Sequence, residues 1–267
     1  MVDKSEKFRW LVRLGFAARG VVYLLLGYIA LGTAGEAQNG QSAVFDYIQE
    51  VPFGTPLLWI MALGLLGYAA FKFLSAFADI QHRGTDTQGG LKRIGDAASG
   101  VAHAFLAYAC YQFASGAQQS SGGGSSGEEM AGSVLSMELG SVLIGAVGLG
   151  FLVAGVMQGK KAWTCEFMHW ISAGAPAAVR TVGRLGHAAR AIVFAIIGWS
   201  MVQGAWFARE SQIKGLGEAI LSLRDMGALY TLVAVGLMLF GAFSLVLARY
   251  RIIPDIGPRG LRPSFRT

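Results

Sequence analysis

The sequence predicts an all-α integral membrane protein of six transmembrane helices, arranged as three parallel two-helix repeats with pseudo-threefold symmetry. Three observations lead to this fold class. The 267 residues are 54% hydrophobic and only 14% charged, a composition too apolar for a soluble domain of this length. Six apolar stretches are long enough to cross a bilayer. A short motif recurs at the start of every second stretch.

The expected spans are apolar stretches of about 20 residues, the length that crosses a hydrocarbon core of roughly 30 Å. They cover residues 12–32, 56–79, 94–115, 134–157, 185–208 and 227–248. The charged N-terminus has no small-residue cleavage site, so we expect the first stretch to be retained as a helix.

The basic residues predict the orientation. Of the 22 Lys and Arg residues, sixteen lie before the first span, after the last, or in the loops that follow the second and fourth spans. Only Arg209, Lys214 and Arg224 lie in loops on the other side. Positive charge is retained in the cytoplasm, so we expect both termini to be cytoplasmic. The partners this favours are membrane lipids with anionic headgroups, and no nucleic acid.

The connecting segments have distinct compositions. Residues 116–127 are a Gly/Ser tract that predicts a flexible linker. Amphipathic stretches that begin at Ser42 and Leu216 predict short helices on the membrane surface. Trp163 and Trp170 are expected to lie at the interface.

An internal repeat organises the chain. RLGFAARGVVY from Arg13, RIGDAASGVAH from Arg93 and RLGHAARAIVF from Arg184 align without gaps, and each begins the first helix of a pair. The second helices share ALGL from Ala62 and AVGL from Ala146 and Ala234. Each unit has two spans, so all copies enter the membrane from the same side and the repeats are parallel. The expected units are residues 1–80, 81–162 and 163–267, the last with a basic tail.

Small residues recur at matched positions of the three first helices. In membranes such residues let neighbouring backbones approach closely, so we expect these helices at the centre, facing a common axis. The predicted packing positions are Gly15, Gly95 and Gly186, followed by Gly20, Gly100 and Ala191, and then Gly27, Ala107 and Gly198.

The repeat motif resembles a family of bacterial membrane proteins made of three tandem two-helix units, the domain of unknown function DUF1206. The features are the opening from Arg13 to Gly20, the Pro52–Gly54 step and the exit from Ala248 to Arg251. The middle copy departs from this pattern, with Ser99 in place of the second arginine, Asp96 and His103 at usually apolar or aromatic sites, and an exit that becomes Gly159-Lys160-Lys161. The resemblance implies a fold and no catalytic residue.

Polar residues inside the spans form the candidate ligand site, because an ionisable group in hydrocarbon is costly unless it is paired or reaches the interface. They are Arg19, Asp96, Ser99 and Arg190. The two arginines could extend to the headgroups, form an ion pair with Asp96, or attract an anion. Because Asp96 is the only carboxylate in a repeat opening, we expect it to pair with one of them. Lys72 is expected to reach the interface.

No cofactor, metal or enzymatic activity is expected. His103 and His187 differ in depth by roughly 10 Å, too far to hold one haem. Cys110 and Cys165 are on opposite sides of the membrane and in no metal-binding spacing. No nucleophile and base converge by spacing.

Two functions therefore remain open. One is a structural, accessory or lipid-binding membrane protein, and the other is a small pore or transporter for an anion along the axis. A packed axis favours the first, and a hydrated axis lined by the polar residues favours the second. The sequence indicates no protein partner.

Overall fold

The computed structural model describes residues 4–32, 41–50, 52–117, 134–137 and 139–253. Each expected span falls on one long helix; these helices are α1 (Lys4–Gly32), α3 (Gly54–Phe77), α4 (Thr87–Ala114), α6 (Gly140–Thr164), α7 (Val179–Phe207) and α9 (Ala228–Tyr250). Five of the six, all except α4, are long and apolar enough to cross a membrane. A membrane-spanning α4 is not confirmed, because His103, Gln112 and two tyrosines lower its hydropathy.

Short helices occur where the amphipathic stretches predict them. They are α2 (Gln41–Glu50) and α8 (Leu216–Leu221), with 3-10 turns η2 (Glu166–Trp170), η3 (Glu210–Gln212) and η4 (Arg224–Met226). Within the described ranges, β structure is limited to one antiparallel bridge between Ile171 and Arg251. The predicted Gly/Ser linker beyond residue 117 and the tail after residue 253 lie outside the described residues.

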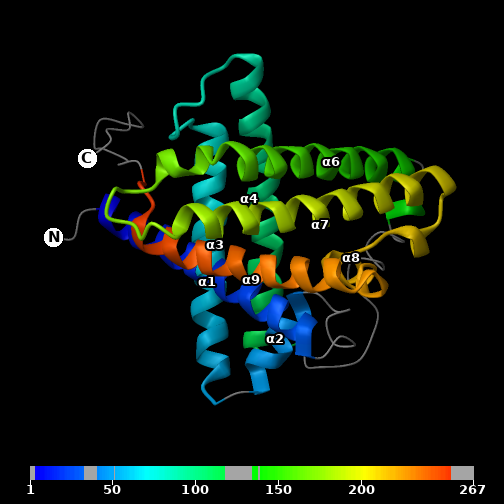
Figure 1. Ribbon diagram of the computed structural model, residues 1–267, viewed down its shortest axis with the longest axis horizontal. Coiled ribbons are helices and arrows are strands. Elements are labelled where there is room, and N and C mark those ends of the chain that lie inside the picture. The colour runs from blue at the N-terminus through cyan, green and yellow to red at the C-terminus, as the bar shows by residue number, and fades with distance from the viewer. Residues whose placement is uncertain (1–3, 33–40, 51, 118–133, 138, 254–267) are drawn as a thin grey trace.

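The six long helices pack as an open series in the order α4, α3, α1, α9, α7 and α6. In Figure 1, α3 and α4 run up the view, α6 and α7 run across it, and α1 and α9 run obliquely below α6 and α7. The centre of the series is therefore α1 and α9, from opposite ends of the chain. In their most apolar windows, 61% of α1 is buried but only 22% of α6.

One junction is repeated three times. We call the first helix of each unit its leading helix (α1, α4, α7) and the second its trailing helix (α3, α6, α9). Each leading helix packs on the trailing helix of the preceding unit, with the third unit preceding the first. A Cβ at Gly20 would lie 2.7 Å from Leu245 of α9, and a Cβ at Gly100 would lie 2.8 Å from the Phe73 ring of α3. A Cβ at Gly155 of α6 would lie 3.2 Å from the carbonyl oxygen of Ala191.

The opening arginines mark the same three junctions. Arg13 donates to the carbonyl of Arg249 at 3.0 Å, Arg93 to that of Ala76 at 2.7 Å, and Arg184 to that of Ala162 at 3.1 Å. Each guanidinium thus binds unpaired carbonyls at the C-terminal end of the trailing helix that precedes it, where positive charge also stabilises the helix dipole.

The contact between the two helices of one unit is made only twice. A Cβ at Gly15 would lie 2.5 Å from the Gly64 carbonyl oxygen, and one at Gly186 would lie 2.6 Å from the Phe240 Cα. At the equivalent Gly95, no atom lies within 4 Å. Within the described part of the chain, α4 and α6 do not form a packed pair with each other, so the middle unit is open there.

This arrangement changes two expectations. The pseudo-threefold arrangement is not confirmed, because the series of helices does not close between α4 and α6. Placing every leading helix at the centre is wrong, since α4 lies at one edge. Gly20, Gly100 and Ala191 lie against trailing helices instead of a common axis, because the matched small residues serve pairwise junctions.

Candidate functional site

Arg19 lies inside an aromatic cage at the centre of the helix series. Its guanidinium carbon is 5.0 Å from the ring centroid of Phe16, 4.9 Å from Tyr68 and 5.1 Å from Phe240. It donates to the Tyr68 hydroxyl at 2.6 Å and to Ser244 Oγ at 3.3 Å. Only 7% of Arg19 is exposed, so its burial does not favour extension to the headgroups, one of the three alternatives for this residue. Facing rings and hydroxyls from α3 and α9 satisfy it in place.

Arg190 shares one wall of that cage. Its guanidinium carbon is 4.4 Å from the Phe240 centroid, 4.6 Å from Phe194 and 5.3 Å from Tyr23. The two arginines therefore both contact Phe240. The Nε of Arg190 is buried without a hydrogen-bond partner. Among the described residues, the ion pairs found involve neither Arg19 nor Arg190.

Asp96 has other partners than the expected ones. Its Oδ1 is 2.7 Å from Lys72 Nζ, and its Oδ2 is 3.0 Å from Arg83 Nε. The second contact is misaligned for a hydrogen bond, so it is a charge contact only. The predicted pairing with Arg19 or Arg190 is wrong, because Asp96 on α4 faces α3 and the following loop. Depth alone did not specify which side of α4 carries the carboxylate.

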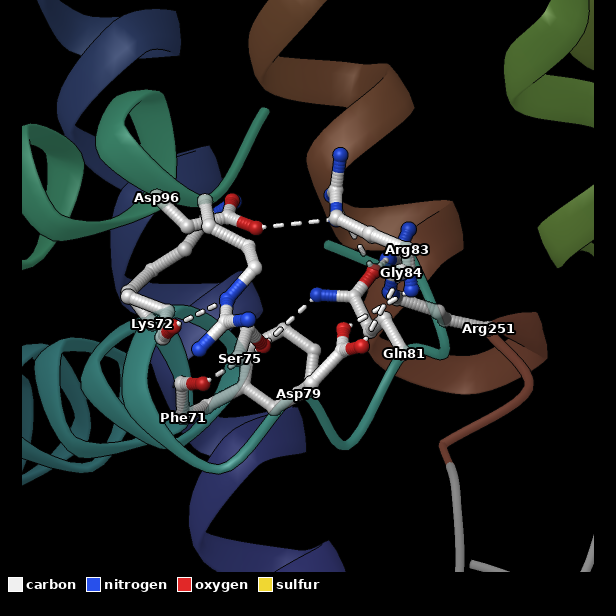
Figure 2. A network of polar contacts seen from close by, with 11 residues as sticks. Phe71, Lys72, Ser75, Asp79, Gln81, Arg83, Gly84, Asp96 and Arg251 are labelled. Carbon is white, nitrogen blue, oxygen red and sulfur yellow. Dashed lines mark hydrogen bonds and ion pairs between the residues drawn. The ribbon is translucent and has the colours of Figure 1, made fainter. Parts of the chain in front are cut away.

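Figure 2 shows the contacts of the loop between α3 and α4, which holds Arg83 next to Asp96. Asp79 accepts hydrogen bonds from the backbone N–H groups of Arg83 at 2.8 Å and Gly84 at 3.0 Å. The turn needs positive φ, 46° at Asp79 and 81° at Gly84, and glycine adopts this conformation without strain. Gln81 donates to Ser75 Oγ at 2.6 Å, which anchors the loop to α3.

The same loop reaches the end of α9. Gln81 Oε1 accepts from Arg251 at 3.2 Å and from Arg83 at 3.4 Å. Arg251 also lies over the rings of Phe16, at 5.3 Å, and Trp170, at 5.7 Å. Burial lowers the pKa of Arg251 to about 10, because desolvation disfavours the charged form.

The remaining expected residues contribute little to this cluster. Ser99 contributes its carbonyl oxygen, 2.7 Å from His103 Nδ1. His187 Nδ1 lies 2.5 Å from Gln158 Oε1, so both histidines have polar partners within or between helices. Among the described residues, no group of three or more His, Cys, Asp or Glu could hold a metal ion.

Sequence reasoning missed five residues of the network. Lys72 was expected to reach the interface, Arg83 was counted only among the basic loop residues and Arg251 only as the end of the exit motif, and Tyr68 and Gln81 were not singled out. A usable signal existed for two of them, since Lys72 and Arg83 are the Lys and Arg residues nearest to α4 in the preceding helix and loop.

Comparisons with known proteins agree with the repeat. The Domain of Unknown Function (DUF1206) matches three times, at residues 14–79, 94–164 and 185–251. A Bacillus subtilis (strain 168) protein, printed as "Uncharacterized protein YxxB", is 29% identical over 261 residues, which cover 93% of this chain and 94% of the relative. No solved structure matches. The three matches coincide with the three helix pairs described above.

Proposed function

The chain belongs to the DUF1206 family, and from this premise we propose that it is a non-enzymatic accessory protein of the bacterial inner membrane that binds lipid in its middle unit. In this proposal all six long helices span the membrane, α4 included, and both termini are cytoplasmic. The orientation is supported by the distribution of Lys and Arg among the loops.

The observation that carries the proposal is the space at Gly95. A Cβ added at the equivalent Gly15 or Gly186 would meet backbone, whereas one added at Gly95 would meet no atom of the described residues within 4 Å. In a bilayer, such an uncovered helix face is filled by lipid or by another protein, because no water is present to solvate it.

The helices on either side of that space are apolar and exposed. Large hydrophobic residues project from α4 and α6 without cover from the rest of the chain; among them are Ile94, Val101, Phe105, Val147, Val153 and Val156. Acyl chains match these surfaces. The basic residues Lys92 and Lys160 lie on the same two helices and suit an anionic headgroup.

Lipid retention tests the proposal. Phospholipid bound per protein is measured by mass spectrometry after purification in mild detergent. Gly95→Trp should fill the space, reduce retained lipid by at least about half and leave the melting temperature unchanged, because nothing is displaced but lipid. Leu232→Trp, an exposed position on α9, is the matched control and should retain lipid. Equal retention by both variants would contradict lipid binding, and loss of a co-purifying protein from Gly95→Trp would indicate a protein occupant instead.

Topology is tested separately. Reporter fusions after residue 120 should report a periplasmic location, and fusions at either terminus a cytoplasmic one. A cytoplasmic signal after residue 120 would rule out a membrane-spanning α4.

A second candidate function is anion transport. It is favoured by Arg19 and Arg190, two interior cations that share Phe240 and have no carboxylate partner in the described part of the chain. Anion flux into proteoliposomes, abolished by Arg190→Gln, would support it. Flux equal to that of protein-free vesicles would exclude it.

A further inference from the structure

We propose that Arg83 and Arg251 bind a phosphate oxyanion beside the C-terminal ends of α3 and α9, where Gln81 holds the two guanidinium groups together. The ligand chemistry is that of a phosphate group, which either the headgroup of an anionic phospholipid or the free ion supplies. This inference goes beyond the lipid-binding role of the middle unit and does not depend on it.

One oxygen atom brings the two arginines together from distant parts of the chain. Gln81 Oε1 accepts a hydrogen bond from Arg251 at 3.2 Å and another from Arg83 at 3.4 Å. Arg83 lies in the loop between α3 and α4, and Arg251 directly follows α9. Both side chains meet at Gln81 in Figure 2. Both guanidinium groups therefore lie within hydrogen-bonding distance of one point.

The shared amide is held in place by the interior of α3. Gln81 and Ser75 are only 3% and 0% exposed. Gln81 Nε2 donates to Ser75 Oγ at 2.6 Å, and Ser75 Oγ donates to the carbonyl oxygen of Phe71 at 2.8 Å. These bonds fix the orientation of the amide, so its oxygen and not its nitrogen faces the arginines. The position between the two guanidinium groups is thus built to carry an acceptor.

The two arginines have more donors than acceptors. Each guanidinium carries five N–H donors, and the side-chain hydrogen bonds found for Arg83 and Arg251 among the described residues both end on Gln81 Oε1. The Nε of Arg251 is buried without a hydrogen-bond partner. The rings of Phe16 and Trp170 attract the charge of Arg251 but offer no oxygen acceptor to its N–H groups. A ligand with several acceptor oxygens would supply what this pair lacks.

The charges around Gln81 do not balance. Asp96 Oδ2 lies 3.0 Å from Arg83 Nε, but Asp96 Oδ1 lies 2.7 Å from Lys72 Nζ, so two cations share one negative charge. The ion pairs found in the described part of the chain do not include Arg251. Two guanidinium groups on one neutral oxygen repel each other where the surroundings screen charge poorly, and an anion between them removes that repulsion.

The pair can be reached from outside the protein. The Arg83 side chain is 22% exposed, its neighbours His82 and Gly84 are exposed, and Arg251 is half-buried. A guanidinium presents parallel N–H groups that match two oxygens of a phosphate, and charge-assisted hydrogen bonds are about twice as strong as neutral ones. A phosphate should therefore bind the two arginines more strongly than the amide oxygen does.

The most informative variant is Gln81→Glu, which replaces an amide by a carboxylate of nearly the same shape. The new negative charge would lie at the atom that both arginines already contact, and the Ser75 hydroxyl can donate to it in place of its present bond. The variant should therefore raise the melting temperature and abolish phosphate binding. A misfolded protein cannot produce both effects.

The experiment uses the full chain, purified in a neutral detergent, with two probes. Inorganic phosphate is titrated by calorimetry at constant ionic strength against chloride. Nanodiscs of phosphatidylcholine, with or without about one third phosphatidylglycerol, then report headgroup-dependent binding by native mass spectrometry. The other variants are Arg83→Gln and Arg251→Lys. Arg180→Gln, at an exposed arginine in the first turn of α7, is the matched control.

Arg83→Gln should weaken binding about tenfold, as expected for one charge-assisted contact to phosphate. Arg251→Lys keeps the charge but loses the planar fork and should weaken binding about threefold. Arg180→Gln should leave binding unchanged. Saturable phosphate binding without a lipid preference identifies the free ion as the source. Retention of phosphatidylglycerol that Gln81→Glu abolishes identifies the headgroup.

Two results would overturn the site. One is the absence of binding for both probes. The other is binding that Gln81→Glu and Arg83→Gln change no more than Arg180→Gln does. Because the Arg83 side chain is partly exposed, Arg83→Gln still decides the question if Gln81→Glu does not fold. The lipid-binding role is tested at Gly95, so the two proposals can fail separately.

Discussion

Gly15 and Gly186 lie against the trailing helices of their own units, whereas Gly95, at the same place in the motif, faces open space. The outer units and the middle unit thus share a small-residue pattern but not a packing arrangement. Small residues permit helices to approach, yet lipid competes for the same surfaces because no hydrophobic force drives helices together in a bilayer. A small-residue motif therefore forms a helix–helix contact only where a particular neighbouring helix packs against it.

Replacing the equivalent glycines by larger residues should give the largest difference in stability between the outer units and the middle unit. Gly186→Leu should destabilise the protein by about 3 kcal/mol, because its side chain would overlap the Phe240 backbone. Gly95→Leu should change stability by less than about 0.5 kcal/mol. Thermal unfolding in detergent measures both. Equal destabilisation would mean that the middle unit is closed in the membrane.

The next largest loss of stability is expected when the ion pairs of Asp96 are removed. Asp96→Asn should cost about 2 kcal/mol, since it leaves Lys72 and Arg83 without their carboxylate. A double-mutant cycle should show coupling with Lys72→Met and none with Arg190→Met. Coupling with Arg190 alone would restore the partner expected from the sequence.

A smaller difference is expected between two tyrosine hydroxyls. Tyr68→Phe removes the acceptor of the buried Arg19 guanidinium and should cost about 1.5 kcal/mol. Tyr108→Phe removes an exposed acceptor of Gln112 on the open side and should be neutral. Chemical unfolding of the two variants side by side gives the comparison, and equal costs would argue against the closed cage around Arg19.

The smallest losses of stability are expected when the opening arginines are replaced, and these losses should be equal in all three units. Arg13→Gln, Arg93→Gln and Arg184→Gln each remove one capping interaction and should each cost about 0.5 to 1 kcal/mol. Unequal costs, measured by the same unfolding assay, would show that the junctions between units are not equivalent.

The positions of the helices in the sequence could be predicted, but which helices pack against each other could not. Apolar length and the motif predict the six long helices, and the amphipathic stretches predict α2 and α8. The opening arginines were interpreted as topology signals and as the start of the repeat motif, although each also caps a trailing helix. That role depends on a partner helix that the motif itself does not identify.

The candidate site shows the same limit. Arg19, Asp96 and Arg190 were selected because polar groups in spans are costly, and all three make specific polar, charged or aromatic contacts. Their partners could not be predicted, because depth along a helix does not say which side of it a residue faces. Gln81 and Arg251 lie in or beside loops, where no periodicity operates.

The contact between α1 and α9 joins the first and the last of the described helices. Arg13 and the Arg249 carbonyl are separated by 236 residues, so at typical translation rates α1 waits roughly 10 to 50 s for its partner. During that interval the glycine face that α9 later covers, including Gly20 and Gly27, is open to lipid or to the insertion machinery. This junction is therefore completed only after α9 has been synthesised, and loss of α9 would leave α1 without its main contact.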